Sequence, residues 1–456
     1  MKKQKFFYGI DFGTTNSTIA VSDSSGKVKT LPVDPQAENP SVVRSTIYIN
    51  QNKEFHFGKS AIDIYAHDVA TGSATSKYLI FTGRYIKVPK ISFIAGYSGE
   101  QLVPEIVEAE KRGYGHLFQS LKLGLSRSYL TPFEIFGEKL SLEKLIGSFL
   151  KEMKSRAEQL MNEEIEEVVI GKPIHFVGNN DDLAVKRLTN AAKEAGFEKI
   201  VFEYEPIGAA WDYGLHQMKT KQTILIFDFG GGTLDISIVS FPSREILANE
   251  GLAVGGDLFN SLIFEKKIAK YFGSQATYGL AKLRLPHFIF DYLKGWYTIS
   301  LLKTKDFEKP LNEFAFLSSN PKAIAALRSL ISNNLGFSLY EEIERVKKNL
   351  SQTNQETFSF QNKNIDTKTQ ITRKEFERII SQQISEVEAT LNHALASAKK
   401  KTEEIDVVAT TGGSSLIPVF QNLLKKKFGS KKLKRQETFT SVATGLALRA
   451  KEIFSP

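Results

Sequence analysis

The segment TILIFDFGGGTLDISIVSF, from Thr223 to Phe241, decides the fold of this chain. Its apolar run Ile224–Phe227 has the composition of a buried strand, and the carboxylate of Asp228 follows directly. Three glycines and Thr233 come next, and a second apolar strand begins beside Asp235. We therefore expect two strands joined by a glycine turn, with an acidic side chain on each strand.

The turn Gly230–Thr233 has the composition of a phosphate-binding loop. Glycine allows backbone conformations in which N–H groups gather around an anion, and the threonine hydroxyl adds a further donor. Asp228 and Asp235 would repel phosphate by themselves, so we expect a divalent cation between the carboxylates and the phosphates. A plain β-hairpin with a flexible glycine turn is the alternative.

A near copy of this segment lies at the start of the chain. FFYGIDFGTTNS, from Phe6 to Ser17, contains an apolar run, the carboxylate Asp11 and then Gly13, Thr14 and Thr15. The copy continues into TIAVSD, which has the composition of another strand. The recurrence favours phosphate binding over a chance pair of glycine turns, and it indicates two related lobes with one ligand between them.

Further polar groups follow other predicted strands. Glu205 comes between a strand at 199–204 and a helix, where it either caps the helix or works in an active site. Gly255–Asp257 precede another helix and offer an anion or sugar contact. A third glycine-rich turn, at 410–415, follows a strand at 405–409. Repeated strands, glycine turns and helices indicate two α/β lobes around a cleft.

Long amphipathic helices are expected at 141–167 and from Lys368 to Ala398, a helix at 180–195 that ends at the cap residue Gly196, and a shorter helix at 340–350. The last of these places Glu344, Lys347 and Ser351 on nearby turns, which is typical of an ordinary salt-bridged surface helix. Residues 272–340 are rich in aromatic side chains and indicate a mostly helical insertion.

Composition excludes several classes of protein. The 456 residues are 41% hydrophobic and 24% charged, which is typical of a globular protein with two to four domains. The absence of cysteine excludes disulfides, thiol nucleophiles and cysteine-based metal sites. No apolar stretch approaches the ~20 residues that cross a bilayer, and the N-terminal run is too short for a signal peptide. We expect a cytoplasmic protein with no membrane partner.

The net charge of +9 includes the basic run KKKFGSKKLKR at 425–435. Such a run can bind nucleic acid or anionic lipid. No aromatic side chains are interleaved in a nucleic-acid-binding pattern, and lysines suit the end of a helix. We therefore expect a solvated helix end and no nucleic-acid partner.

Together these motifs resemble the ATPase domain of the heat-shock protein 70 (DnaK-like) chaperones, in the actin-like ATPase superfamily. GIDFGTTNS (Gly9–Ser17) and IFDFGGGTLDISIV (Ile226–Val239) are similar to the two phosphate motifs of the family. VGGDLFN (Val254–Asn260) is similar to its GGEDFD segment, and TTGGSSLIP (Thr410–Pro418) to its adenosine motif. The resemblance implies an α/β fold with two ribonuclease H-like duplicated lobes, each with insertions, around a central nucleotide cleft.

The resemblance also implies a division of the chain. Lobe I would span 1–220 with an insertion at about 40–120, and lobe II would span 221–435 with an insertion at about 261–374. The C-terminal helix at 436–456 would return to lobe I. Because the sequence stops after this helix, we expect a short, YegD-type relative that has no peptide-binding domain and no client site of its own.

Catalytic roles follow from the same resemblance. Asp11, Asp228, Asp235 and Glu205 would hold a hydrated Mg²⁺ and orient the attacking water, and Lys122 lies near the position of the family's catalytic lysine. The expected catalytic residues are Asp11, Lys122, Glu205, Asp228, Thr233 and Asp235. The expected nucleotide-binding residues are Gly13, Thr14, Thr15, Asn16, Gly230, Gly231, Gly232, Thr233, Gly255, Gly256, Asp257, Glu344, Lys347, Lys348, Ser351, Gly412, Gly413 and Ser414.

The resemblance gives the helix at 340–350 a different interpretation. Glu344, Lys347 and Ser351 match the family's adenosine-holding helix, which replaces the salt-bridged surface helix. Lys348 and Leu416 stand where the family has arginines near the adenine, so a looser grip on the base is expected.

The expected function is that of a slowly hydrolysing Mg-ATPase, which works as a nucleotide-dependent switch for an unknown protein partner or co-chaperone. The aromatics Phe288, Phe290, Tyr292 and Trp296 would form either a partner site or a core for the insertion. A filament-forming cytoskeletal ATPase is the alternative. A small-molecule kinase is another, although the sequence offers no candidate base beyond the shared carboxylates.

Overall fold

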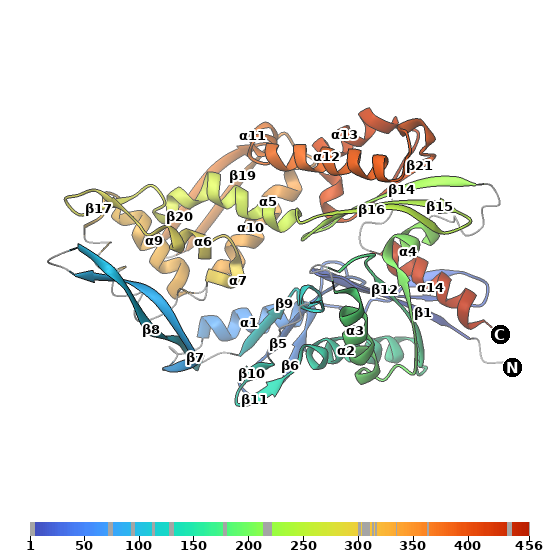
Figure 1. Ribbon diagram of the computed structural model, residues 1–456, viewed down its shortest axis with the longest axis horizontal. Coiled ribbons are helices and arrows are strands. Elements are labelled where there is room, and N and C mark those ends of the chain that lie inside the picture. Colours follow the sequence, from blue (N-terminus) through green and yellow to red (C-terminus); the bar gives the residue numbers. More distant parts are fainter. Residues whose placement is uncertain are drawn as a thin grey trace.

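The computed structural model describes residues 5–71, 76–92, 96–111, 115–126, 132–176, 180–212, 221–299, 302, 311, 314, 317–333, 335–362, 364–435 and 440–455. For residues 69–71, 76–92, 96–111, 297–298 and 435 it describes the backbone alone. Two lobes built from sheets and helices face each other (Figure 1). The α/β class expected from the sequence is confirmed.

The first lobe is built on a sheet with the strand order β13-β12-β1-β2-β3, in which β4 also pairs with β2. These strands are β1 (Phe7–Phe12), β2 (Asn16–Ser22), β3 (Val28–Thr30), β4 (Val43–Arg44), β12 (Glu167–Lys172) and β13 (Lys199–Tyr204). β1 is antiparallel to β2 and parallel to β12. Asp11 and the turn after β1 therefore lie at the carboxyl edge of the parallel strands.

The second lobe repeats this arrangement in the order β16-β15-β14-β21-β22. These strands are β14 (Gln222–Phe229), β15 (Leu234–Phe241), β16 (Glu245–Leu252), β21 (Val407–Thr411) and β22 (Leu433–Arg435). β14 is antiparallel to β15 and parallel to β21. The hairpin β14–β15 thus occupies the position that β1–β2 occupies in the first lobe, as the repeated sequence motif indicates.

Helices α2 (Leu142–Met161) and α3 (Asp181–Glu194) pack together over the apolar core of the first lobe. α2 begins where the Ser141 hydroxyl accepts the N–H of Lys144 at 3.1 Å. It ends at Asn162 in the left-handed conformation, so the helix expected to reach residue 167 was too long. α3 begins after Asn180 and is followed by Gly196 with a positive φ, as its cap residues indicate.

The two lobes share a third apolar cluster. It joins Phe7 and Val169 of the first sheet to Ile224 and Ala409 of the second. Helices α4 (Glu205–Asp212) and α14 (Ser441–Phe454) pack on each other, and α14 also lies against β1, β2 and β12. The crossing is close, because a Cβ at Gly445 would overlap the Gly208 carbonyl.

The first lobe carries an insertion between β4 and α2. It contains β5 (Thr46–Ile49), β6 (Phe55–Phe57), α1 (Gly58–Thr71), the paired strands β7 (Ser76–Ser92) and β8 (Gly96–Lys111), β9 (His116–Gln119), the 3₁₀ turn η1 (Leu121–Gly124), β10 (Phe133–Ile135) and β11 (Glu138–Leu140). β5 pairs with β6 and β9. The turn η1, which carries Lys122, follows β9 directly.

The second lobe carries an insertion between β16 and β21. Its first part contains α5 (Gly256–Ile263), the π-helical turn η3 (Phe264–Ile268), η4 (Ala269–Phe272), β17 (Thr277–Tyr278), β18 (Leu283–Arg284), α6 (His287–Tyr292), α7 (Trp296–Ile299), α9 (Pro321–Ser332) and α10 (Gly336–Leu350). Its second part contains β19 (Gln355–Asn362), β20 (Ile365–Thr372), α11 (Arg373–Ile379), α12 (Ser381–Ser397) and η6 (Thr402–Glu404). The turn η7 (Gly413–Leu416) and α13 (Pro418–Phe428) follow β21.

The long helix expected from Lys368 to Ala398 is wrong at its start. Residues up to Thr372 belong to β20, which pairs with β19. A capping box of Thr372 and Glu375 begins α11, and Ile380 separates α11 from α12. The strand residues carry buried side chains at alternate positions, a pattern that the helix assignment overlooked.

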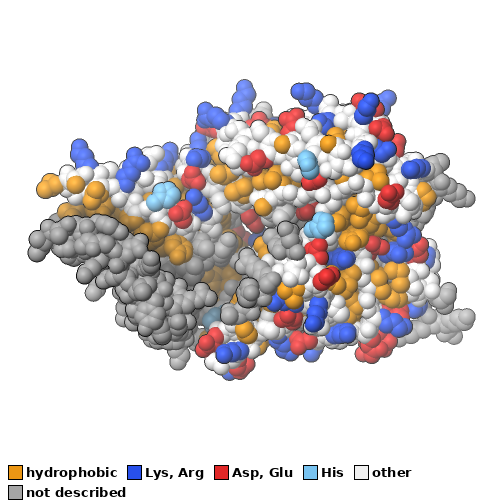
Figure 2. Space-filling model, in the orientation of Figure 1, with side chains coloured by type: hydrophobic (Ala, Val, Ile, Leu, Met, Phe, Trp, Pro, Cys, Tyr) orange, Lys and Arg blue, Asp and Glu red, His pale blue; other side chains and the backbone are white. Residues whose placement is uncertain are grey.

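In the part of the chain that the structure describes, no helix combines the length and apolar character needed to cross a bilayer. On the face drawn in Figure 2, basic and acidic side chains are interspersed over both lobes. The basic run at 425–435 begins in the last turn of α13 and continues through the following turn into β22.

Candidate functional site

The two glycine turns face each other between the lobes. A Cβ built on Gly231, after β14, would lie 3.0 Å from the hydroxyl oxygen of Thr15, after β1. A Cβ on Gly232 would lie 3.8 Å from the side-chain methyl carbon of Thr14. Two segments more than two hundred residues apart thus form opposite sides of one site.

The turn of the first lobe is fixed by a serine that the motif does not include. Ser45 donates its hydroxyl to the carbonyl of Gly13 at 2.8 Å and its backbone N–H to the carbonyl of Thr15 at 2.9 Å. Its hydroxyl also lies 2.8 Å from that of Ser17. Ser45 follows the short strand β4, and only the pairing of β4 with β2 brings it to the turn. No local sequence signal marks this role.

The turn of the second lobe is held by two other expected segments. The N–H of Gly256, at the start of α5, donates to the carbonyl of Gly230 at 3.2 Å. The N–H of Asp257 donates to the carbonyl of Gly231 at 2.8 Å. The Ser414 hydroxyl, from η7, donates to the carbonyl of Gly230 at 2.7 Å. The turn after β14, the start of α5 and the turn after β21 therefore form one assembly.

Two positions of this assembly require glycine, because the backbone of a neighbouring segment lies too close for a side chain. A Cβ at Gly255 would overlap the carbonyl of Gly231, and a Cβ at Gly412 would overlap that of Phe229. Gly412 also has a φ of 78°, which disfavours any other residue. Gly413 follows it as the first residue of η7.

Acidic side chains gather beside the turns. Asp228 and Asp235 are direct cross-strand partners in the hairpin β14–β15, Asp11 lies near the end of β1, and Glu205 begins α4. Lys122 donates its ammonium to Glu205 Oε1 at 2.6 Å, and its side chain is only 9% exposed. A glutamate at the start of α4 and a lysine of the turn η1 thus form a buried ion pair.

Three of these carboxylates, Glu205, Asp228 and Asp235, line one pocket. Pro173 and Ile174, from the segment after β12, form part of its wall. The pocket therefore lies between the sheet edges of both lobes, where the sequence placed the cleft.

The charges in this cluster are unbalanced. Burial, together with the charge of Glu205, raises the pKa of Asp11 to about 7, although Lys122 opposes the effect. Burial raises the pKa of Asp235 to about 6 and that of Asp228 well above its ordinary value. Burial alone would lower the pKa of Lys122, but the charges of Glu205 and Asp11 raise it overall. The cluster holds more negative than positive charge, which favours a bound cation.

A hydrated divalent cation fits these donors. Among the described residues, no three Asp, Glu or His side chains converge closely enough to coordinate an ion directly. Mg²⁺ prefers carboxylate oxygens and keeps several of its waters, so it suits carboxylates that are spread around a pocket. Thr233 supports this arrangement, because its hydroxyl donates to Asp235 Oδ2 at 3.0 Å. Asp11, Asp228, Asp235 and Glu205 are the residues that would hold the ion through water.

Helix α10 joins the second turn through α5. The Lys347 ammonium lies 2.6 Å from Glu344 Oε2 and donates to the carbonyl of Gly256 at 3.0 Å. Asn260 donates its side-chain amide to Glu344 at 2.7 Å. Burial would raise the pKa of Glu344, but Lys347 lowers it to about 2. Asn260 closes the quoted VGGDLFN motif, yet its contact with α10 gives no signal in the sequence.

Other expected residues lie farther from the turns. Lys348 is exposed, and Ser351 follows the last turn of α10. Among the hydrogen bonds and ion pairs found for the described residues, none joins Lys348 or Ser351 to the glycine turns. Asn16 begins β2 and pairs with Arg44 of β4, while Asp257 contacts the second turn through its backbone.

Comparison with known proteins finds one family. A model of the family described as Hsp70 protein matches residues 111–283 and 306–456. The chain is 28% identical over 447 residues to the chaperone protein dnaK of Cyanidioschyzon merolae, an alignment that covers 97% of this chain and 61% of the relative. It is 23% identical over 453 residues to the chaperone protein DnaK of Thermosipho melanesiensis, which covers 98% of this chain and 59% of that relative. The chain thus spans about 60% of the length of these relatives.

Proposed function

This chain belongs to the Hsp70 family, and from that premise we propose that it binds Mg-ATP between its lobes and hydrolyses it slowly. The observation that carries the proposal is the pair of glycine turns that face each other beside the acidic cluster. Backbone N–H groups in such turns bind phosphate, and the carboxylates suit the cation that accompanies it.

The nucleotide is oriented by the two sides of the site. The β- and γ-phosphates lie between the turn at Gly13–Thr15 and the turn at Gly230–Thr233. The adenosine lies toward α10 and η7, where Glu344, Lys347 and Ser414 are joined to the second turn through Gly256 and Gly230. Lys348 and Ser351 contribute at the edge of this site.

Hydrolysis uses the groups of the acidic cluster. Mg²⁺, when bound, supplies positive charge to the phosphates. Glu205 orients the attacking water, and its ion pair with Lys122 holds both side chains in place. The Lys122 ammonium stabilises the negative charge that develops on the transferred phosphoryl group. Asp11, Asp228 and Asp235 would hold the hydrated cation beside the phosphates.

The output is a change in lobe closure that a protein partner detects, because a nucleotide that binds one lobe arrangement more tightly shifts the population toward it. Both relatives are named as chaperone proteins, which supports a chaperone-related role. Of the four aromatics expected to form a partner site or a core, Phe290 and Trp296 pack against the core of the second lobe, whereas Phe288 and Tyr292 are exposed. The exposed pair is the better candidate for a partner contact.

The division into lobes at 1–220 and 221–435 is part of the proposal, and the packing of α14 on β1 and β2 supports a C-terminal helix that returns to the first lobe. The family match favours this function over a cytoskeletal filament or a small-molecule kinase. A YegD-type assignment remains a prediction.

Isothermal titration calorimetry tests the proposal. We expect heat of binding with Mg-ATP and Mg-ADP that falls sharply in EDTA. Asp228→Ala should weaken the metal-dependent binding strongly, whereas Asp182→Ala, at an exposed position on α3, should not change it. Folded protein that gives no heat with Mg-ATP would contradict the proposed function.

A further inference from the structure

Two aromatic side chains join the lobes at their insertions. Tyr65 lies on α1 of the first lobe and Trp296 on α7 of the second, and their ring centroids are 6.1 Å apart with planes inclined at 59°. The two rings belong to one apolar cluster with Tyr48, Ile64 and Leu117. In Figure 1, α7 lies beside α1 across the gap between the lobes.

Tyr65 is anchored firmly in the first lobe. Its side chain is 5% exposed, and its ring meets that of Tyr48 edge-on at 5.5 Å. The Tyr48 hydroxyl donates to Asp68 at 2.7 Å and accepts the N–H of Gly115 at 2.8 Å. Tyr65 therefore moves with the sheet of β5 and with α1.

Trp296 is anchored to the elements that carry the candidate adenosine site. Its ring packs edge-on against Phe337, in the first turn of α10, at 5.1 Å. Just before α7, the carbonyl of Leu293 accepts the hydroxyl of Tyr340 at 2.8 Å. The carbonyl of Lys294 accepts the hydroxyl of Ser261, on α5, at 2.6 Å. α7 is therefore tied to α5 and α10, and α10 also carries Glu344 and Lys347.

Both aromatic residues lie outside the segments that the family model matches. Tyr65 precedes residue 111, and Trp296 lies between residues 283 and 306. The family model therefore covers neither side of this contact.

We propose that Tyr65 and Trp296 form a latch that holds the lobes closed and sets the rate at which bound nucleotide leaves. The inference rests on the proposed function, since it concerns release from the same site. For the lobes to separate at their insertions, the two rings must part and expose apolar surface to water. Because Trp296 packs against α10, closure of the lobes acts directly on the helix that carries Glu344 and Lys347. Trp296 is therefore a positioning residue for the nucleotide rather than a ligand.

The rate of ADP release tests the latch. We load the protein with a fluorescent ADP analogue and chase it with excess ATP in a stopped-flow instrument. Trp296→Ala removes the aromatic pair and should therefore speed the release of the ADP analogue by about three- to tenfold. The matched control is Phe288→Ala, at an aromatic of the same insertion that is 48% exposed and lies outside the latch. Equal release from wild type and Trp296→Ala would overturn the proposal.

A cross-linking variant tests the same contact without relying on a destabilising truncation. Because the chain has no cysteine, the double variant Tyr65→Cys/Trp296→Cys offers a single reactive pair. We expect a short bis-thiol reagent to link the pair efficiently and to slow ADP release below the wild-type rate. Absence of the link, or a linked protein that releases ADP at the unlinked rate, contradicts the latch alone. A wild-type chain that retains no nucleotide contradicts the proposed function as well.

Discussion

At the scale of single residues, the ion pair of Lys122 and Glu205 is central to the proposed hydrolysis. Its lysine is about as buried as Lys154, which forms a comparable ion pair with Glu158 at 2.6 Å on α2. Burying a charged pair costs solvation free energy, so a buried pair in a pocket is a candidate for function. The ion pair of Lys154 and Glu158 lies outside the site and serves as a matched control.

We expect Glu205→Ala and Lys122→Ala to bind ATP yet to hydrolyse it about 10²-fold more slowly, the scale of a positioned water-orienting group. Single-turnover hydrolysis with quantified bound ATP measures this effect. Lys154→Ala should lower stability without a comparable loss of rate. An unchanged rate in Lys122→Ala would show that another lysine has the catalytic role.

The raised pKa values of the acidic cluster give a second prediction, on stability. Asp11 and Asp235, with pKa values of about 7 and about 6, keep protons that the unfolded chain has already released. Since the folded state binds more protons between about pH 4 and pH 7, the free energy of unfolding of the ion-free protein falls as pH rises through this range. A bound cation opposes this loss because it favours the ionised carboxylates.

Wild type should therefore lose more stability than Asp11→Asn when the pH of the ion-free protein is raised from 5 to 8. We expect the two losses to differ by on the order of 1–3 kcal/mol in the free energy of unfolding. Urea unfolding in EDTA at both values of pH gives the difference. Asp182→Asn, which removes an exposed carboxylate, serves as the control. If wild type and Asp11→Asn lose equal stability between pH 5 and pH 8, the burial of Asp11 does not raise its pKa.

The sequence predicted the residues of the two turns and, for the second turn, the supporting segments at Gly256 and Ser414, but it did not predict the contacts of Ser45 and Asn260. The turns are contiguous motifs whose glycines, hydroxyls and carboxylates are visible in order, and one motif repeats the other. Ser45 and Asn260 act through contacts with Gly13 and Glu344, which are 32 and 84 positions away. Such contacts depend on the packing of separate elements, so no local pattern could identify them. Lys122 was found only through the family resemblance.

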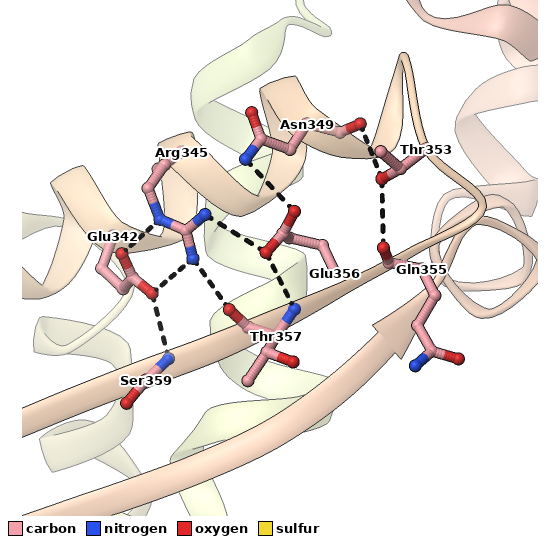
Figure 3. Close-up of polar contacts among 8 residues, drawn as sticks. All are labelled: Glu342, Arg345, Asn349, Thr353, Gln355, Glu356, Thr357 and Ser359. Carbon is pink, nitrogen blue, oxygen red and sulfur yellow. Dashed lines mark hydrogen bonds and ion pairs between the residues drawn. The ribbon is translucent and has the colours of Figure 1, made fainter.

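At the scale of elements, a polar network ties α10 to β19 (Figure 3). Arg345 donates to Glu342 at 2.7 Å, to Glu356 at 3.2 Å and to the carbonyl of Thr357 at 2.8 Å. Glu342 also accepts the N–H of Ser359 at 3.0 Å. The hairpin β19–β20 therefore supports α10, while Glu344 and Lys347 of the same helix contact α5.

We expect Arg345→Ala to lower the free energy of unfolding by about 1 kcal/mol, because these contacts are partly exposed and water screens the charges. Arg345→Lys should lie between wild type and Arg345→Ala, since lysine keeps the charge but cannot contact three acceptors in the same fork geometry. Urea unfolding measures both variants. Equal stability of all three proteins would mean that the network does not contribute to the attachment of α10.

Elements with local start and stop signals were predicted well. α3 has Asn180 before its first turn and Gly196 after its end, and these two residues determine its length. The hairpin β19–β20 was missed, although Phe358, Ile365 and Ile371 are buried in it. Its strands lie between two amphipathic helices and contain many polar residues that fit either structure. Only tertiary packing decides between a helix and a strand in such a segment.

At the scale of the whole molecule, the apolar clusters couple the two lobes at more than one place. One cluster joins the two main sheets through α4 and α14, and another contains both Tyr65 and Trp296. The glycine turns lie between the sheets, and Glu205 lies at the start of α4. A change at the phosphates is therefore well placed to alter lobe closure.

The repeated sheet order was predictable because the two hairpin motifs recur in the sequence. The contact between the insertions was not, because Tyr65 and Trp296 are separated by 231 positions and neither belongs to a motif. The aromatic content of the second insertion indicated either a core or a partner surface. In the structure Phe290 and Trp296 pack against the core of the second lobe, whereas Phe288 and Tyr292 are exposed.

A crystal structure of the protein grown with Mg-ATP tests the central claim most directly. We expect ADP and phosphate, or intact ATP, with the phosphates between Gly13–Thr15 and Gly230–Thr233. We also expect a hydrated cation beside Asp11, Asp228 and Asp235, and the adenosine against α10. Nucleotide bound elsewhere, with both glycine turns empty in an otherwise ordered crystal, would contradict the proposal.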